Sequence, residues 1–176
     1  MKCDFDRQLL ITLMGQLEGL SQHRACPVVG ITGPPGVGKS TLSAALAAEL
    51  YSQSELCAVV LSLDDFYFSK ALLQQRAELL HPLFATRGLP GTHDIDLLLN
   101  LLRAILSNNH SDMLVPRFSK QLNDRLPLSE WGLLPDKIDL VLLEGWCLGA
   151  SAQSDQQLAM PVNQLERQFD ADASWR

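Results

Sequence analysis

Residues 33–40 read Gly-Pro-Pro-Gly-Val-Gly-Lys-Ser, a glycine-rich run that restricts the local fold strongly. Glycines let the backbone curl until several N–H groups face one point, where an anion can be held. The short apolar segment 27–32 predicts a buried strand before this run, and the Ala- and Leu-rich segment 39–50 predicts a helix after it. Strand, loop and helix in this order are typical of a phosphate-binding loop, so we expect a nucleotide site here.

The positions of this pattern have distinct expected roles. Lys39 is expected to reach the β- and γ-phosphates of ATP and to take part in catalysis, and the Ser40 hydroxyl is expected to bind Mg²⁺. Thr41 has two equal interpretations, a contact with the α-phosphate or an ordinary position in the first helical turn. The candidate nucleotide-binding residues are Gly33, Pro34, Pro35, Gly36, Val37, Gly38, Lys39, Ser40 and Thr41.

Strand and helix patterns alternate along the chain. Continuous apolar runs predict two further buried strands, at 58–63 and 138–143. Helices are expected at about 4–20, 39–50, 70–80 and 94–106. A short edge strand is expected at 113–116, since Pro116 cannot donate a ladder hydrogen bond. The alternation predicts an α/β protein, a P-loop NTPase-type three-layer fold with a parallel sheet.

We expect one domain over residues 1–176. It comprises an N-terminal helix at about 4–20, a nucleotide-binding core at about 27–149 and a polar tail at 150–176. The tail shows no further buried strand, so the sheet is expected to be incomplete on its C-terminal side.

The composition is that of a globular protein, with 47% hydrophobic residues and a net charge of −6. This acidic balance argues against a nucleic-acid or anionic-membrane surface. The N-terminus lacks the pattern of a secretory signal, and the longest apolar stretch, 97–106, is too short to span a bilayer. We expect a cytoplasmic protein whose scattered cysteines are reduced: Cys3, Cys26, Cys57 and Cys147.

Acidic residues follow the second and third expected buried strands. Glu144 comes directly after an apolar run, where its carboxylate would help to hold Mg²⁺, the alternative being an acid that faces solvent. Asp64 and Asp65 would lie at the same edge of the sheet, where a carboxylate can deprotonate a substrate hydroxyl. One of the two aspartates could instead cap the next helix. Two features argue against a signalling GTPase: Glu144-Gly145 stands in place of Asp-Gly, and the sequence contains no Asn-Lys-x-Asp.

Five segments together carry a more specific resemblance. They are 33–41, 62–67 (Ser-Leu-Asp-Asp-Phe-Tyr), 91–94 (Gly-Thr-His-Asp), 115–118 (Val-Pro-Arg-Phe) and 143–149 (Leu-Glu-Gly-Trp-Cys-Leu-Gly). In this order the set resembles the D-glycerate 3-kinases and their bacterial and fungal kinase-like relatives. The broader group looks like uridine kinase, phosphoribulokinase and pantothenate kinase. The resemblance covers roughly residues 27–176.

The resemblance implies roles on the acceptor side. It matches Asp64 to the catalytic base, places Arg117 in a loop that contacts the acceptor, and puts His93 and Asp94 in an acceptor-side motif. The residues leave alternatives open: Asp94 as a helix cap, Lys120 and Arg125 as solvated charges, and Tyr67 as core packing. The candidate substrate-binding residues are Asp65, Tyr67, His93, Asp94, Arg117, Lys120 and Arg125.

The favoured hypothesis is an ATP- and Mg²⁺-dependent kinase for a small anionic alcohol, with D-glycerate implied by the resemblance. Arg117, Lys120 and Arg125 would supply cations for the carboxylate of such an acceptor. Because the resembling families continue further, we expect a chain truncated at its C-terminus. The alternative is therefore a catalytically weak ATP-binding protein that acts through a partner. An oligomer is not excluded, and a regulatory GTPase is disfavoured.

Overall fold

The computed structural model describes residues 5–175 of the 176. Cys3 and the expected helix start at Asp4 lie outside the described residues. The first helix is α1, Arg7–His23, which begins and ends later than expected. The Asp6 carboxylate caps it by accepting a hydrogen bond from the Gln8 N–H at 2.8 Å.

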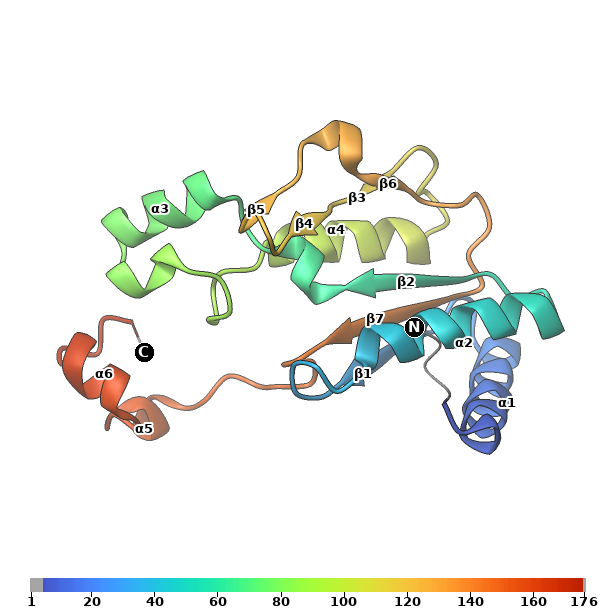
Figure 1. The fold of residues 1–176 in the computed structure, drawn as a ribbon, viewed down its shortest axis with the longest axis horizontal. Coiled ribbons are helices and arrows are strands. Elements are labelled where there is room, and N and C mark those ends of the chain that lie inside the picture. Colours follow the sequence, from blue (N-terminus) through green and yellow to red (C-terminus); the bar gives the residue numbers. More distant parts are fainter. Residues whose placement is uncertain (1–4, 176) are drawn as a thin grey trace.

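A parallel three-stranded sheet forms the centre of the fold (Figure 1). Its strands lie in the order β1 (Val28–Thr32), β7 (Leu140–Gly145) and β2 (Ala58–Ser62). The middle strand pairs with both neighbours, since Ile31 and Ser62 are both in register with Glu144. All three strands therefore end at the same edge of the sheet.

Helices cover both faces of this sheet, which confirms the expected three-layer α/β architecture (Figure 1). On one face, α1 and α2 (Lys39–Ser54) bury an apolar cluster against alternate strand residues such as Leu140 and Leu142. On the other face, α4 (Ile95–Leu106) packs with the residues in between, among them Leu61 and Val141. Side chains that alternate between two covered faces explain why the central strand β7 is continuously apolar in the sequence. The expectation of a buried strand before the glycine-rich run is wrong in one respect: β1 lies at an edge of the sheet, and its residues are exposed or half-buried.

The remaining helices and strands lie outside the central sheet. The remaining helices are η1 (Leu63–Phe66), α3 (Lys70–Leu79), η2 (Pro82–Ala85), η3 (Leu128–Glu130), α5 (Asp155–Leu158) and α6 (Gln164–Phe169). Two small antiparallel pairs join β3 (Leu114–Val115) with β6 (Gly132–Leu133), and β4 (Phe118–Ser119) with β5 (Asp124–Arg125). The sequence analysis predicted no strand in the stretch that the β4–β5 hairpin occupies.

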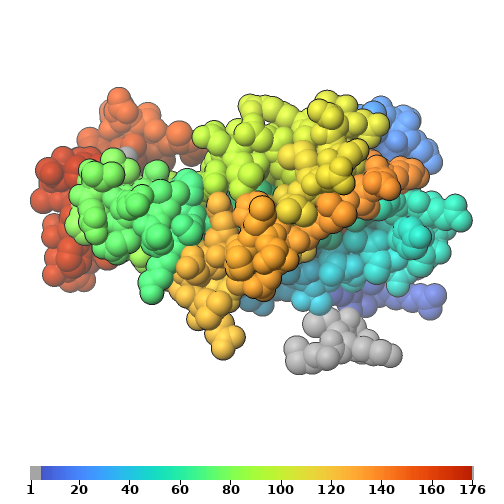
Figure 2. All heavy atoms as spheres, turned by 90° about the horizontal axis from the view of Figure 1, so that it is seen from above, coloured from blue at the N-terminus to red at the C-terminus, as the bar shows by residue number. Residues whose placement is uncertain are grey.

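The C-terminal segment runs back to the region of α3 and η2 (Figures 1 and 2). The His81 ring fixes this contact, because its Nε2 donates to the Phe169 carbonyl at 2.8 Å while its Nδ1 accepts from the Leu83 N–H at 3.2 Å. Figure 2 shows the red C-terminal segment beside the green α3 segment at one end of the molecule. The expected polar tail therefore contains two short helices and no strand among its described residues.

Among residues 5–175, none of the helices combines the length and the hydropathy that crossing a bilayer requires.

The α4 face of the core yields a stability prediction. Leu101 is 1% exposed, so Leu101→Ala removes buried methyl groups and leaves a cavity, and we expect it to cost about 2–5 kcal/mol of unfolding free energy. Leu106 lies on the same helix and is 54% exposed, so Leu106→Ala should cost about 0.5 kcal/mol or less. Urea denaturation of both variants checks this, and equal losses would contradict the proposed packing.

Candidate active site

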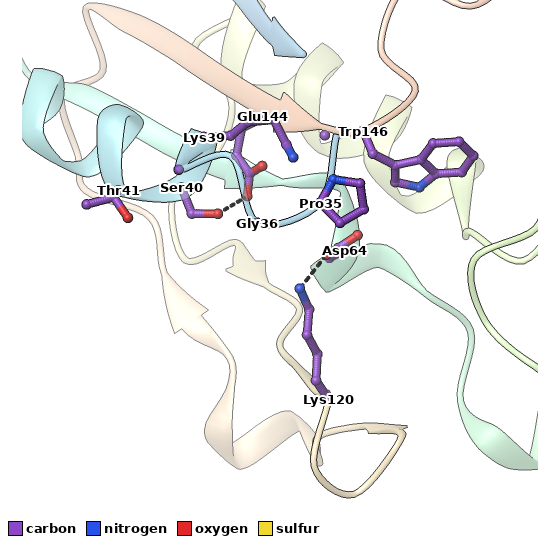
Figure 3. A pocket seen from close by; sticks show the side chains of 11 residues that line it. Pro35, Gly36, Lys39, Ser40, Thr41, Asp64, Lys120, Glu144 and Trp146 are labelled. Atoms are coloured by element: carbon purple, nitrogen blue, oxygen red, sulfur yellow. Dashed lines mark hydrogen bonds and ion pairs between the residues drawn. The ribbon is translucent and has the colours of Figure 1, made fainter. Parts of the chain in front are cut away.

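Three segments that are far apart in the sequence meet at the carboxyl edge of the sheet (Figure 3). The loop 33–38 follows β1, Asp64 lies in η1 directly after β2, and Glu144 belongs to the end of β7. Ligands of open α/β sheets bind at this edge. A pocket of about 260 Å³ opens here, lined by Pro35, Gly36, Gly38, Lys39, Ser40, Thr41, Asp64, Lys120, Glu144, Gly145 and Trp146.

The glycines of the loop have the conformations that the pattern requires. Gly36 and Gly38 have φ angles of 80° and 98°, in the left-handed region that disfavours side chains. Gly38 is also the N-cap of α2, and no side chain caps that helix. The first-turn N–H groups of α2 therefore point to the loop without a side-chain acceptor, at the positive end of the helix dipole. This arrangement suits the phosphate groups of a nucleotide.

Lys39 and Ser40, the two residues of the motif with expected chemical roles, both line the pocket. The Lys39 ammonium group donates to the Pro34 carbonyl at 3.0 Å, so it lies over the loop. Ser40 points from the first turn of α2 toward Glu144, as Figure 3 shows. Thr41 also lines the pocket, which is compatible with both of its interpretations.

Glu144 is only 4% exposed and is held by two hydroxyl groups. Its Oε1 accepts hydrogen bonds from Ser40 Oγ at 2.8 Å and from Ser62 Oγ at 2.6 Å. A hydroxyl and a carboxylate oxygen at this separation are hard ligands of the kind that Mg²⁺ prefers. The described residues contain no group of three or more His, Cys, Asp or Glu side chains that could hold a metal.

Asp64 lies across the pocket from the phosphate loop and is paired with Lys120 (Figure 3). Lys120 Nζ is 2.6 Å from Asp64 Oδ2, and the lysine side chain is 66% exposed. An ion pair this exposed is weak, so a ligand can displace the lysine without a large loss. The pocket therefore contains the Asp64 carboxylate, whose ion-pair partner Lys120 a ligand can displace.

The other acids and arginines of the acceptor side hold one another. Asp65 accepts from the Phe118 N–H and from Arg117, both at 3.0 Å, and so joins η1 to β4. Arg125 donates to the Tyr67 and Phe66 carbonyls at 2.9 and 3.1 Å and to the Asp94 carboxylate at 3.1 Å.

The two interpretations of Asp94 and Arg125 can now be compared with their contacts. Asp94 accepts from the Leu97 N–H at 3.1 Å and caps α4, in agreement with the helix-cap alternative. The guanidinium group of Arg125 is turned inward and mostly occupied, so it is not a solvated surface charge. Its contacts suit a role in holding Tyr67 and Asp94 in place.

Tyr67 and His93 form a stacked pair near Asp64. Their ring centroids are 4.0 Å apart, and their backbones form an antiparallel bridge. Burial lowers the pKa of His93 below its usual value of 6.5, and the Asp64 charge partly opposes this. His93 Nε2 is buried and has no hydrogen-bond partner among the described residues. Burial also raises the pKa of the Tyr67 phenol, with the Asp64 charge as the second cause. Both rings are therefore mainly uncharged at pH 7, and the Asp64 charge raises the pKa of each.

The structure brings together only part of the expected site in one pocket. Lys39, Ser40, Thr41, Asp64, Lys120 and Glu144 line it along with loop residues. The expected acceptor-side residues outside this lining are Asp65, Tyr67, His93, Asp94, Arg117 and Arg125. Of these, Tyr67 and His93 are linked to Asp64 through its charge.

Sequence reasoning missed two residues at the sheet edge. Ser62 bonds to Glu144, and Trp146 lines the pocket. Ser62 could have been found from the expected strands, since the last polar residue of a parallel strand faces the same edge as its neighbours. The three described cysteines, Cys26, Cys57 and Cys147, are free, and burial raises the pKa of each thiol.

Comparison with known proteins finds kinases. A family model described as the methylmalonyl Co-A mutase-associated GTPase MeaB matches residues 7–65, about one third of the chain. The chain is 38% identical over 132 residues to the uncharacterized kinase mug58 of Schizosaccharomyces pombe, covering 69% of this chain and 46% of that protein. It is 32% identical over 162 residues to the chloroplastic D-glycerate 3-kinase of Arabidopsis thaliana, covering 82% of this chain and 35% of that protein.

A solved structure shares the fold. The D-glycerate 3-kinase from Cryptococcus neoformans superposes with a TM-score of 0.74 at 28% identity, over 92% of this chain and 60% of that one. The chain thus spans less than half the length of both curated relatives. The expected relationship to the P-loop kinases is confirmed by these matches.

The stacked histidine yields a prediction about pH. Because folding lowers the pKa of His93, the unfolded chain takes up this proton more readily, and stability falls as the pH drops below about 6.5. His93→Phe keeps an aromatic ring against Tyr67 but cannot be protonated, so it should lose less stability between pH 7 and pH 5 than the wild type. Thermal unfolding across this range measures the effect.

The matched control is His23→Phe, a change of the same type at an exposed position at the end of α1. It should follow the wild-type pH dependence. If His93→Phe also follows it, the buried state of this ring is not the cause of the pH effect.

Proposed function

Because the chain is homologous to P-loop kinases that include D-glycerate 3-kinases, we propose that it transfers the γ-phosphoryl group of ATP to a small alcohol. The observation that carries the proposal is the meeting of three groups at one pocket: the phosphate loop, the Ser40–Glu144 pair and Asp64. A loop alone would suit any nucleotide-binding protein. A carboxylate facing it across a pocket adds the group that an alcohol acceptor needs.

The nucleotide half of the site would work through charge and position. Lys39 and the N–H groups of the loop and of α2 would hold the phosphates of ATP, and Ser40 with Glu144 would hold Mg²⁺. ATP would supply the phosphoryl group, and Mg²⁺ would neutralise part of the negative charge on the phosphate oxygens. The two serine hydroxyls on Glu144 keep its carboxylate aimed at the same point before any ligand binds.

Asp64 would serve the acceptor hydroxyl. Its carboxylate accepts the proton of the hydroxyl as the oxygen attacks phosphorus, and the bond to the leaving ADP oxygen breaks. Lys120 lies against the same carboxylate and can move to a developing negative charge, because it is exposed and held by one ion pair. Asp64 would thus be the base, and Lys120 would stabilise the negative charge that develops during the transfer.

The acceptor proposed here is an acidic alcohol of the D-glycerate type. Two of the relatives named above are D-glycerate 3-kinases, and Lys120, between β4 and β5, lines the pocket. Asp65, Tyr67, His93 and Arg117 lie outside the pocket lining and are proposed to surround this acceptor. ATP is the proposed nucleotide, and GTP is the competing one because the matching family model is that of a GTPase.

The direct test measures ADP or GDP release by the 176-residue chain with Mg²⁺. ATP and GTP are each supplied with D-glycerate, with pantothenate, and without an acceptor. We expect release that depends on ATP and D-glycerate and that disappears in Lys39→Ala. Release that is independent of every acceptor, or that prefers GTP without an acceptor, would contradict the kinase proposal.

Asp64→Asn separates transfer from binding. Asn keeps the size of the side chain but cannot take the proton, so acceptor-dependent release should fall by about 100-fold or more. The affinity for ATP, measured by calorimetry, should stay near that of the wild type because the phosphate loop is unchanged. Lys39→Ala is the contrasting variant, since it should weaken ATP binding itself. An active Asp64→Asn enzyme would rule out Asp64 as the base.

A further inference from the structure

Aromatic rings and basic side chains gather near Asp64, outside the lining of the pocket except for Lys120. Tyr67 stacks on His93, and the Phe118 ring meets Tyr67 edge-on at 5.3 Å. We call Asp64, Tyr67, His93 and Phe118 the acceptor-side cluster. Arg87, Lys120 and Arg125 contact this cluster or its backbone, and Arg117, the residue before Phe118, is paired with the neighbouring Asp65.

Three of these cations are already paired with a carboxylate. Arg117 lies 3.0 Å from Asp65, and Lys120 lies 2.6 Å from Asp64. Arg125 is paired with Asp94 at 3.1 Å and also donates to two backbone carbonyls. An acceptor carboxylate that approached any of these three would compete with an acid of the protein itself.

Arg87 differs from them. Among residues 5–175 no carboxylate lies within 4.0 Å of its guanidinium group, and its side chain makes a neutral polar contact, from Nη1 to Asn123 Oδ1. Its guanidinium carbon lies 5.6 Å from the centre of the Phe118 ring, over the ring face. Stacking on an aromatic ring fixes the plane of a guanidinium group while its N–H edges stay free for a ligand.

The loop that carries Arg87 is tied at its end to the chain beside the acceptor-side cluster. Gly88 and Gly91, with φ angles of 103° and 80°, turn the chain between Arg87 and His93. The Phe68 N–H donates to the Thr92 carbonyl at 3.0 Å, which ties the end of this loop to the chain that follows Tyr67. Arg87 is therefore presented from an ordered turn.

An independent indication places the Arg87 charge at the cluster. The Arg87 charge lowers the pKa of the Tyr67 phenol, whereas the Asp64 charge raises it, although burial is the largest influence on that pKa. Arg87 and Asp64 thus both act on Tyr67. A substrate alcohol beside Tyr67 would therefore lie near the Asp64 carboxylate, which can take its proton, and near the Arg87 guanidinium group, which is not paired with an acid among the described residues.

We propose that Arg87 binds the carboxylate of the acceptor and makes the site prefer acidic alcohols to neutral ones of the same shape. The inference rests on the proposed function, because it assumes that the acceptor lies at the acceptor-side cluster. A guanidinium group can donate two parallel hydrogen bonds to a carboxylate, and one neutral contact to Asn123 leaves enough donors for this. Sequence reasoning assigned this role to Arg117, Lys120 and Arg125 and did not consider Arg87.

The test compares binding of D-glycerate with binding of glyceramide, its uncharged amide. Calorimetric titrations use the full chain with Mg²⁺ and a non-hydrolysable ATP analogue, so that they do not depend on turnover. Loss of a charge-assisted contact predicts that Arg87→Gln weakens D-glycerate binding by about 10-fold to 100-fold. Glyceramide binding should change little, and Arg87→Lys should restore part of the D-glycerate affinity. Arg103→Gln, an equal charge change on the exposed face of α4, should leave both affinities at the wild-type level.

Several outcomes would overturn the proposal. One is an equal loss of affinity for both ligands in Arg87→Gln, which would indicate a loosened loop. The others are an unchanged D-glycerate affinity in Arg87→Gln and no D-glycerate binding by the wild type. The proposed function fails separately, if the wild type releases no ADP with any acceptor. Arg87-dependent binding of D-glycerate without phosphoryl transfer would support this inference and reject only the kinase activity.

Discussion

The parallel pairing of β7 with β1 on one side and β2 on the other determines the geometry of the whole site. It brings the phosphate loop, Asp64 and Glu144 to one edge of the sheet, although the sequence separates them widely. Ser62 and Glu144 are register partners, so their side chains leave the sheet together and bond at 2.6 Å. With β7 elsewhere in the order, the loop after β1 would lack its carboxylate.

Each acid at this edge is balanced in a different way, and the difference suits the role proposed for it. Glu144 is buried, which is costly for a charge unless hydrogen bonds or a cation compensate, and two hydroxyls provide part of that compensation. Asp65 is held by Arg117 and a backbone N–H and links two elements. Asp64 is paired with the exposed Lys120, so it is the acid whose partner leaves most easily.

Sequence reasoning predicted the central strands and the main helices, because apolar runs and helical spacing are local patterns. The nucleotide-binding residues were predicted from a motif with fixed roles, and the structure gathers most of them at one pocket. The acceptor side depends on contacts between distant segments, which spacing does not reveal. Arg125 reads as a surface cation, but tertiary hydrogen bonds to Tyr67 and Phe66 turn it inward. The β4–β5 hairpin was missed because its strands are two residues long and polar. Arg87 was missed because only the fold places it against Phe118.

The most direct test of this account is the Mg²⁺ dependence of ATP binding, since the Ser40–Glu144 pair is claimed to be a metal site. Calorimetry would compare ATP affinity in Mg²⁺ and in EDTA for the wild type and for Glu144→Gln, whose amide can still accept the serine hydrogen bonds. The account predicts that Mg²⁺ strengthens ATP binding to the wild type and that most of this gain disappears in Glu144→Gln. An equal gain in both proteins would contradict it, and would place the metal away from the edge that β7 forms.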